Sequence, residues 1–174
     1  MPQNTEQLDA ILFAGGEPGG SHARALLKQY EIFVATSEAL SARRQNVNAF
    51  FLSANSIILA AAGLLWSNGQ KGDLESLALI ALGYAGSILC FAWRKLIRSY
   101  RQLSQGKFDV IHALERQLPA QVFEAEWVAL GKGEDSTRYT PFTKTERVTP
   151  MLFGVVQVLV ACVGGASLFR ILSP

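Results

Sequence analysis

The sequence predicts an all-α integral membrane protein with three transmembrane helices, in which the first two helices continue as long cytoplasmic extensions. Three apolar runs each approach the ~20 residues that cross a hydrocarbon core of ~30 Å. None of the 16 lysines and arginines lies within these runs. A soluble domain of this size usually carries more charge than the 17% found here, so the composition points the same way.

The three predicted transmembrane helices are residues 49–66, 74–93 and 151–169. The first run is slightly short for a span, and the second begins close to Glu75, which would lie among the headgroups. Trp66 and Trp93 stand at run ends, where indole rings favour the membrane interface. Three uncharged runs in one small chain favour membrane spans over the buried core helices of a soluble protein.

The positive charges predict the orientation of these spans. Of the lysines and arginines, four precede residue 49 and ten lie in 94–149, whereas the loop 67–73 holds one. The positive-inside rule therefore places the N-terminus and the segment 94–150 in the cytoplasm. The loop and the C-terminus are then external. The N-terminal segment lacks the basic start of a signal peptide, and its apolar stretch is too short for one.

The predicted cytoplasmic part begins with residues 1–20, a flexible N-terminal segment that ends in GGEPGG. Residues 21–48 then show apolar residues at helical spacing, and no glycine or proline interrupts the chain from 21 to 62. We expect one continuous helix that starts in the cytoplasm and enters the bilayer near Asn48.

The segment 94–150 is predicted to be a cytoplasmic helical region. The apolar pattern of the second span continues to Pro119, with Gly106 as a weak point. A short helix at about 120–130 and a polar, turn-rich stretch at 131–150 follow. The long helices form an antiparallel pair, and self-association is an economical way to bury the apolar stripes that one small protomer leaves uncovered. Alternatively, the stripes pack only on each other.

Two stretches of the sequence resemble the RipA-like family of small bacterial inner-membrane proteins. They are YEIFVATSEALSARRQNVNAFFLSANS at 30–56 and WRKLIRSYRQLSQGKFDVIHALERQLP at 93–119, the second followed by FEAEW at 123–127. The resemblance implies a multi-pass protein of the bacterial inner (cytoplasmic) membrane that assembles as a homo-oligomer, described for the family as an octamer. The chain is more distantly similar to two-span proteins proposed as pore-forming effectors, but its third span departs from their pattern.

The sequence shows no pattern of residues that indicates catalysis. GKGEDST at 131–137 lacks the spacing of a phosphate-binding loop. His22 and His112 stand alone, and Cys90 and Cys162 lie in apolar runs, so we expect no metal site, disulfide or cofactor. A net charge of +2 argues against a nucleic-acid partner.

A basic cluster follows the second predicted span directly, made of Arg94, Lys95, Arg98 and Arg101. Each cation beside an anionic leaflet contributes about 1 kcal/mol of attraction. The cluster is therefore a candidate site for anionic lipid headgroups. The alternative is that these side chains only anchor the topology.

A polar column runs along the first long helix. Ser41, Asn48 and Asn55 are spaced by seven residues and share nearly one face, with Gln45 beside them. Amides within the bilayer rarely face lipid, so these residues are candidates for an oligomer interface or for the lining of a pore. Gln157 in the third span raises the same choice. Small residues at Gly83, Gly86, Gly164 and Gly165 favour close contact between helices.

These observations favour a non-enzymatic homo-oligomeric protein that acts as a scaffold or regulator at the membrane, with membrane lipids and its own copies as partners. The alternative is a channel or pore along the axis of the oligomer. An enzyme acting on lipids is disfavoured, because no nucleophile or acid–base pair stands out in the sequence.

Overall fold

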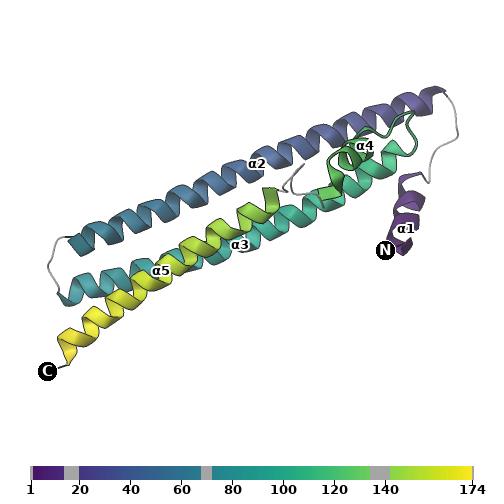
Figure 1. Ribbon diagram of the computed structural model, residues 1–174. Coiled ribbons are helices and arrows are strands. Elements are labelled where there is room, and N and C mark those ends of the chain that lie inside the picture. The colour runs from purple at the N-terminus through teal and green to yellow at the C-terminus, as the bar shows by residue number, and fades with distance from the viewer. Residues whose placement is uncertain (1, 14–19, 68–71, 134–141, 174) are drawn as a thin grey trace. The chain divides into compact units, whose positions relative to one another are not determined.

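The computed structural model describes residues 2–13, 20–67, 72–133 and 142–173, and the regular elements within these ranges are helices (Figure 1). In chain order they are α1 Pro2–Leu12, α2 Gly20–Ser67, α3 Asp73–Glu115, α4 Val122–Ala129, the 3₁₀ turn η1 Gly131–Gly133, and α5 Phe142–Leu172. The predicted all-α class is confirmed.

Among the described residues, three helical stretches are long and apolar enough to cross a membrane. They are Ala23–Ser67 in α2, Asp73–Glu115 in α3 and Val148–Ile171 in α5. At about 1.5 Å per residue, the first two exceed a ~30 Å hydrocarbon core by roughly a factor of two. Only part of α2 and of α3 is therefore needed for the crossing, as the sequence predicted.

Contacts within the chain divide it into two compact units, which we describe separately. The membrane unit comprises Arg44–Ser99 and Phe142–Pro174, and the extension unit comprises Met1–Arg43 and Tyr100–Pro141. Helices α2 and α3 contribute to both units because each is continuous through the point of division.

In the membrane unit, α5 lies along α3 and both contact α2 (Figure 1). The Phe51 ring of α2 stacks on Trp93 of α3, with ring centroids 5.8 Å apart. Trp93 in turn contacts Phe153 of α5 at 6.3 Å. The pairs Asn48–Glu146 and Asn55–Gln157 show that α2 and α5 run in the same direction. This is the relation that the first and third of three successive spans require.

In the extension unit, α2 and α3 form the predicted antiparallel pair. Tyr30 of α2 contacts Glu115 at the end of α3, whereas Thr36, later in α2, contacts Lys107, earlier in α3. The two helices therefore run in opposite directions. The buried side chains of this unit include Leu26 and, on α3, Ile111 and Leu114. Helix α1 is attached by an ion pair of 2.6 Å between Asp9 and Arg116.

The helices differ from the predictions at three places, which are the N-terminal segment, the end of α3 and the start of α5. The structure has α1 within the segment expected to be flexible, of which residues 14–19 lie outside the described ranges. Helix α3 ends at Glu115 rather than at Pro119, because a residue before proline disfavours the α conformation and residues 116–118 instead form turns. Gly106 does not interrupt α3, and α4 falls within the predicted 120–130.

The largest difference concerns the stretch 131–150, predicted to be rich in turns. Helix α5 begins at Phe142, well before the expected start of the third span, and Pro150 lies inside it. Proline is costly within a helix because it removes one backbone hydrogen bond, yet α5 continues through Pro150. The rest of the predicted turn region, residues 134–141, and most of the loop 67–73 lie outside the described residues.

Candidate functional site

A cluster of three polar side chains, which we call the polar core, lies inside the membrane unit. The Asn55 side chain of α2 is fully buried. Its Oδ1 accepts hydrogen bonds from the Cys90 thiol of α3 at 3.1 Å and from Gln157 Nε2 of α5 at 3.5 Å. Its Nδ2 donates to the backbone oxygen of Phe51, one turn earlier, at 2.9 Å. One amide therefore joins the three spanning helices.

Gln157, the second amide of the polar core, is also fully buried, and its Oε1 has no hydrogen-bond partner among the described residues. The Gln157 amide fits only because residue 86 is a glycine, since a Cβ at that position would overlap the amide. Gly86 thus lets a long polar side chain lie flat between α3 and α5. This arrangement places the amide beside Asn55 instead of against lipid, where an unpaired polar group is costly.

Glycines also bring the backbones of α3 and α5 together. A Cβ on Gly83 would lie 2.6 Å from the backbone nitrogen of Ala161, and one on Gly164 would lie 2.9 Å from that of Ile80. The predicted close contact is confirmed at Gly83, Gly86 and Gly164. Gly165 makes no such contact within one subunit, because its added Cβ would meet nothing within 4 Å.

A second cluster, the boundary cluster, lies at the Asn48 end of the membrane unit. Asn48 Oδ1 accepts a hydrogen bond of 2.9 Å from the Trp93 indole, and its Nδ2 donates to Glu146 Oε1 at 3.1 Å. Arg44 Nε lies 3.6 Å from the same carboxylate oxygen. Buried charges in proteins are normally paired, and here the cation and the anion come from α2 and α5. Trp93 is buried in this cluster and hydrogen-bonded to protein.

The polar column predicted on α2 is therefore divided. Asn48 and Asn55 turn inward within the membrane unit, where they bond to α3 and α5. Ser41, in the extension unit, and Gln45 are exposed. Because Asn55 and Gln157 are enclosed by their own subunit, their surroundings favour a packing role over the lining of a pore.

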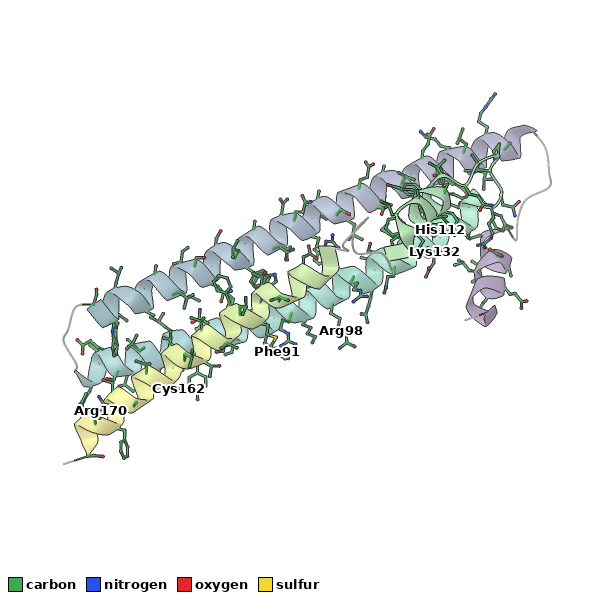
Figure 2. All side chains as sticks on the ribbon, in the orientation of Figure 1. Phe91, Arg98, His112, Lys132, Cys162 and Arg170 are labelled. Carbon is green, nitrogen blue, oxygen red and sulfur yellow. The ribbon has the colours of Figure 1, made fainter. Side chains whose placement is uncertain are left out.

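The predicted basic cluster is divided in a comparable way. Arg94, Lys95 and Arg98 are exposed and line a groove of about 360 Å³ on α3, together with Phe91 and Ile97. Arg101 does not line this groove and belongs to the extension unit. Figure 2 shows Phe91 and Arg98 projecting from the same side of α3, as their spacing of seven residues requires.

The extension unit contains a buried carboxylate that the sequence analysis did not single out. Glu115, at the end of α3, is only 1% exposed. Its carboxylate accepts a hydrogen bond of 2.9 Å from the Tyr30 hydroxyl and another of 2.9 Å from the backbone N–H of Phe123. The N–H of Glu124 is 3.4 Å away. A negative group at the N-terminus of a helix satisfies its free N–H donors and its dipole, so Glu115 fixes α4 in place.

Two neighbours complete this site. Burial and the hydrogen bond to Glu115 raise the pKa of Tyr30, which precedes the predicted spanning segment of α2, to about 12, so the phenol remains a donor at physiological pH. His112 Nδ1 lies 3.6 Å from Glu115 and 3.7 Å from Glu124, beside α4 (Figure 2). In the part of the chain that the structure describes, no group of three metal-ligating side chains converges here or elsewhere.

Two acids that the sequence did not single out, Glu115 and Glu146, have partners from distant segments of the chain. A signal for Glu146 was available, since an acid shortly before a span needs a compensating group if it is buried. No sequence signal indicated that Glu115 is buried, because an acid near the end of a helix is ordinarily solvated. Only the folding of α4 back onto α3 removes it from water.

The outer surface of the membrane unit is apolar. Phe50, Ile57 and Ile88 are each more than 60% exposed, whereas Asn55 and Gln157 are fully buried. Polar groups inside and apolar groups outside suit a hydrocarbon solvent, in which backbone and side-chain polar atoms must be satisfied internally. Together with the three long apolar helices, this pattern defines a helical integral membrane protein.

Residues 27–165 match the octameric membrane protein family (8xMP). Since the match covers most of the chain, the protein belongs to this family, whose name describes its members as octameric. The expected membership in a family of octameric membrane proteins is confirmed. The name RipA-like is not part of the match. No curated protein and no solved structure matches the chain.

Proposed function

We propose that the protein is a non-enzymatic, homo-oligomeric scaffold or regulator of the bacterial inner membrane, with the extension unit in the cytoplasm. The observation that carries this proposal is the apolar surface of α4. Val122 is 62% exposed and Val128 is 51% exposed, and α4 buries no residue completely. In the cytoplasm no lipid tails are available to cover such a surface, and a second copy of the chain can cover it.

The family description supports the choice of a second copy over an unrelated partner, because the family is named for octamers. In the octamer each α4 surface would be covered by a neighbouring subunit. The resulting ring of extension units would present a repeated cytoplasmic surface to other components of the membrane. A scaffold needs such a repeated surface and needs no catalytic group.

The polar core also supports this proposal over the alternative of a channel. Asn55 and Gln157 are bonded to each other inside one subunit, and their surroundings are complete apart from one amide oxygen. A pore lined by these amides would require them to leave the contacts that join α2, α3 and α5. A channel along the oligomer axis would have to be lined by other residues.

The mass of the detergent-solubilised particle tests the oligomer. We expect the mass of the wild-type particle to be a multiple of the protomer mass, and Val128→Glu to reduce it because the new charge would be buried at the subunit interface. The matched control is Gln102→Glu, which adds the same charge at an exposed position of the same unit. A wild-type monomer, or an unchanged particle mass for Val128→Glu, would contradict the role of α4.

Ion or solute flux through liposomes containing the same particle separates the scaffold from the channel. We expect no flux above that of empty liposomes. Reporter fusions test the orientation: fusions at Gln70 and at the C-terminus should behave as external, and one at Asp135 as internal. An internal reporter at Pro174 would mean that the third run does not cross the membrane.

A further inference from the structure

We propose that the groove on α3 lined by Phe91, Arg94, Lys95, Ile97 and Arg98 is a binding site for one anionic glycerophospholipid. Its ligand is recognised by two chemical features, a phosphate that carries net negative charge and an acyl chain attached close to it. The proposal rests on the proposed orientation only for the leaflet in which the lipid lies, because the described lining residues all belong to the membrane unit.

The spacing of the lining residues explains the site. Positions 91, 94, 95 and 98 follow the i, i+3, i+4, i+7 pattern and so share one face of α3. Phe91 is 71% exposed and belongs to the predicted span, whereas the three cations begin immediately after it. The same helix face thus changes from apolar to cationic over about one turn, as a phospholipid changes from acyl chain to phosphate.

The cations of the groove have no acidic partner within the described part of the chain. Among the described residues, Arg94, Lys95 and Arg98 take part in no ion pair, although Arg44, Lys28 and Arg116 do. Three cations within one groove repel each other, and a phosphate between them removes that repulsion. Two guanidinium groups also offer the planar pairs of N–H donors that match phosphate oxygens.

The size of the groove fits one headgroup. Its volume of about 360 Å³ is at the lower end of the roughly 300–1,000 Å³ found for small-molecule sites. The buried Ile97 forms an apolar part of its wall, and Phe91 is free to contact the first methylenes of an acyl chain. A soluble anion such as inorganic phosphate would use the cations and leave Phe91 without a partner.

Arg101 provides the comparison that separates a site from general attraction to an anionic surface. It is three residues beyond Arg98 and belongs to the same basic cluster, but it does not line the groove. General attraction would treat all four cations alike, since each contributes a similar amount near a membrane surface. A site requires that Arg94, Lys95 and Arg98 contribute more than Arg101.

The experiment is native mass spectrometry of the delipidated particle in detergent, titrated with dioleoyl phosphatidylglycerol or with dioleoyl phosphatidylcholine. We expect tighter binding of the phosphatidylglycerol. Each of Arg94→Gln, Lys95→Gln and Arg98→Gln should weaken it about ten-fold, since each removes a direct hydrogen bond to a charged phosphate, and the three together should weaken it about a thousand-fold. Arg101→Gln should weaken it less than two-fold, and Phe91→Ala should weaken it measurably without altering any charge.

Two results would overturn the proposal. Equal losses for Arg101→Gln and the three single groove variants would show general attraction to anionic lipid. Binding of inorganic phosphate or of sn-glycerol 3-phosphate as tight as that of the lipid, and unaffected by Phe91→Ala, would show a site for a soluble anion. The unchanged mass of each variant particle shows that it has assembled, and the single variants carry the test if the triple variant does not assemble. The binding measurements do not depend on whether the protein is a scaffold or on its orientation in the membrane.

Discussion

The membrane unit and the extension unit hold their helices together by different means. In the membrane unit, the glycines at 83 and 164 bring α3 and α5 into backbone contact, and the enclosed side chains include two amides. In the extension unit, the enclosed side chains include Ile111 and Leu114, and a buried carboxylate gathers donors from two other helices.

The difference follows from the two solvents. Lipid tails are as apolar as leucine, so burial of an apolar side chain in the membrane unit stabilises little, and close packing must supply the attraction between helices. In water, burial of apolar area stabilises the fold by about 25 cal/mol per Å². Hydrogen bonds that are protected from water then determine which helices pack together. The comparison predicts that changes at the packed glycines have the largest effect in the membrane unit, and that loss of a buried polar group costs more in the extension unit than in the membrane unit.

The largest effect is expected for Gly83→Leu in the membrane unit. The new side chain would meet the backbone of α5, which cannot rotate away, so α3 and α5 must separate. We expect a loss of more than about 3 kcal/mol, since overpacking costs about 1–3 kcal/mol even where neighbours are flexible side chains. Thermal unfolding in detergent measures it.

Gly165→Leu is the matched control, because nothing lies within 4 Å of its added Cβ. Leucine is a better helix former than glycine by a few tenths of a kcal/mol or more, so this variant should be as stable as the wild type or slightly more stable. Equal behaviour of the two variants would show that backbone contact does not hold the membrane unit together.

In the extension unit, the largest effect of a polar change is expected for Glu115→Ala. The substitution leaves the Tyr30 hydroxyl and the first N–H groups of α4 without an acceptor, and hydrogen bonds to a charged group contribute about 1.5–3 kcal/mol. We expect faster amide hydrogen exchange in α4 and a loss of about 2–3 kcal/mol. Glu126→Ala, at an exposed position of α4, should change neither quantity.

A smaller effect, about 1 kcal/mol near neutral pH, is expected for Tyr30→Phe, which removes one hydrogen bond to Glu115. The raised pKa of Tyr30, about 12, gives this difference a pH dependence. The folded state holds the phenol neutral, so the stabilisation is complete below the ordinary tyrosine pKa of about 10 and is lost as pH rises toward 12. The stability difference between wild type and Tyr30→Phe should therefore shrink between about pH 10 and 12. A constant difference would mean that the buried hydrogen bond to Glu115 is absent.

An effect as small as that of Tyr30→Phe is expected for Asn55→Leu. Hydrogen bonds between spanning helices average about 0.6 kcal/mol, so loss of the bonds to Cys90 and Gln157 should lower stability by roughly 1 kcal/mol. Particle size and liposome flux should not change, because Asn55 is enclosed by its own subunit. Gln45→Leu, at an exposed position, is the control. A smaller or heterogeneous particle for Asn55→Leu would instead place Asn55 at a subunit interface, and an abolished flux would place it in a pore.

Sequence patterns predicted best those features that depend on a single helix. The continuity of α2 follows from the absence of glycine and proline between 21 and 62, and the three spans follow from their length and lack of charge. The same patterns failed at α5, because a polar, turn-rich stretch was expected up to residue 150, whereas the helix begins at Phe142 and continues through Pro150. A proline weakens a helix by a local amount, and contacts of the preceding residues, such as that of Glu146 with Asn48, can outweigh it.

By itself, the sequence determined the helical class, the three spans and the uneven distribution of positive charge, because length, apolarity and charge are properties of single segments. Only the tertiary structure decided that Asn55 meets Gln157, that Glu115 fixes α4, and that Arg101 is separate from the groove of Arg94, Lys95 and Arg98. Helical spacing states which residues share a face, but the neighbour of that face depends on how distant segments pack. For a polar residue in a membrane protein, that neighbour determines whether it meets lipid, water or a partner within its own subunit.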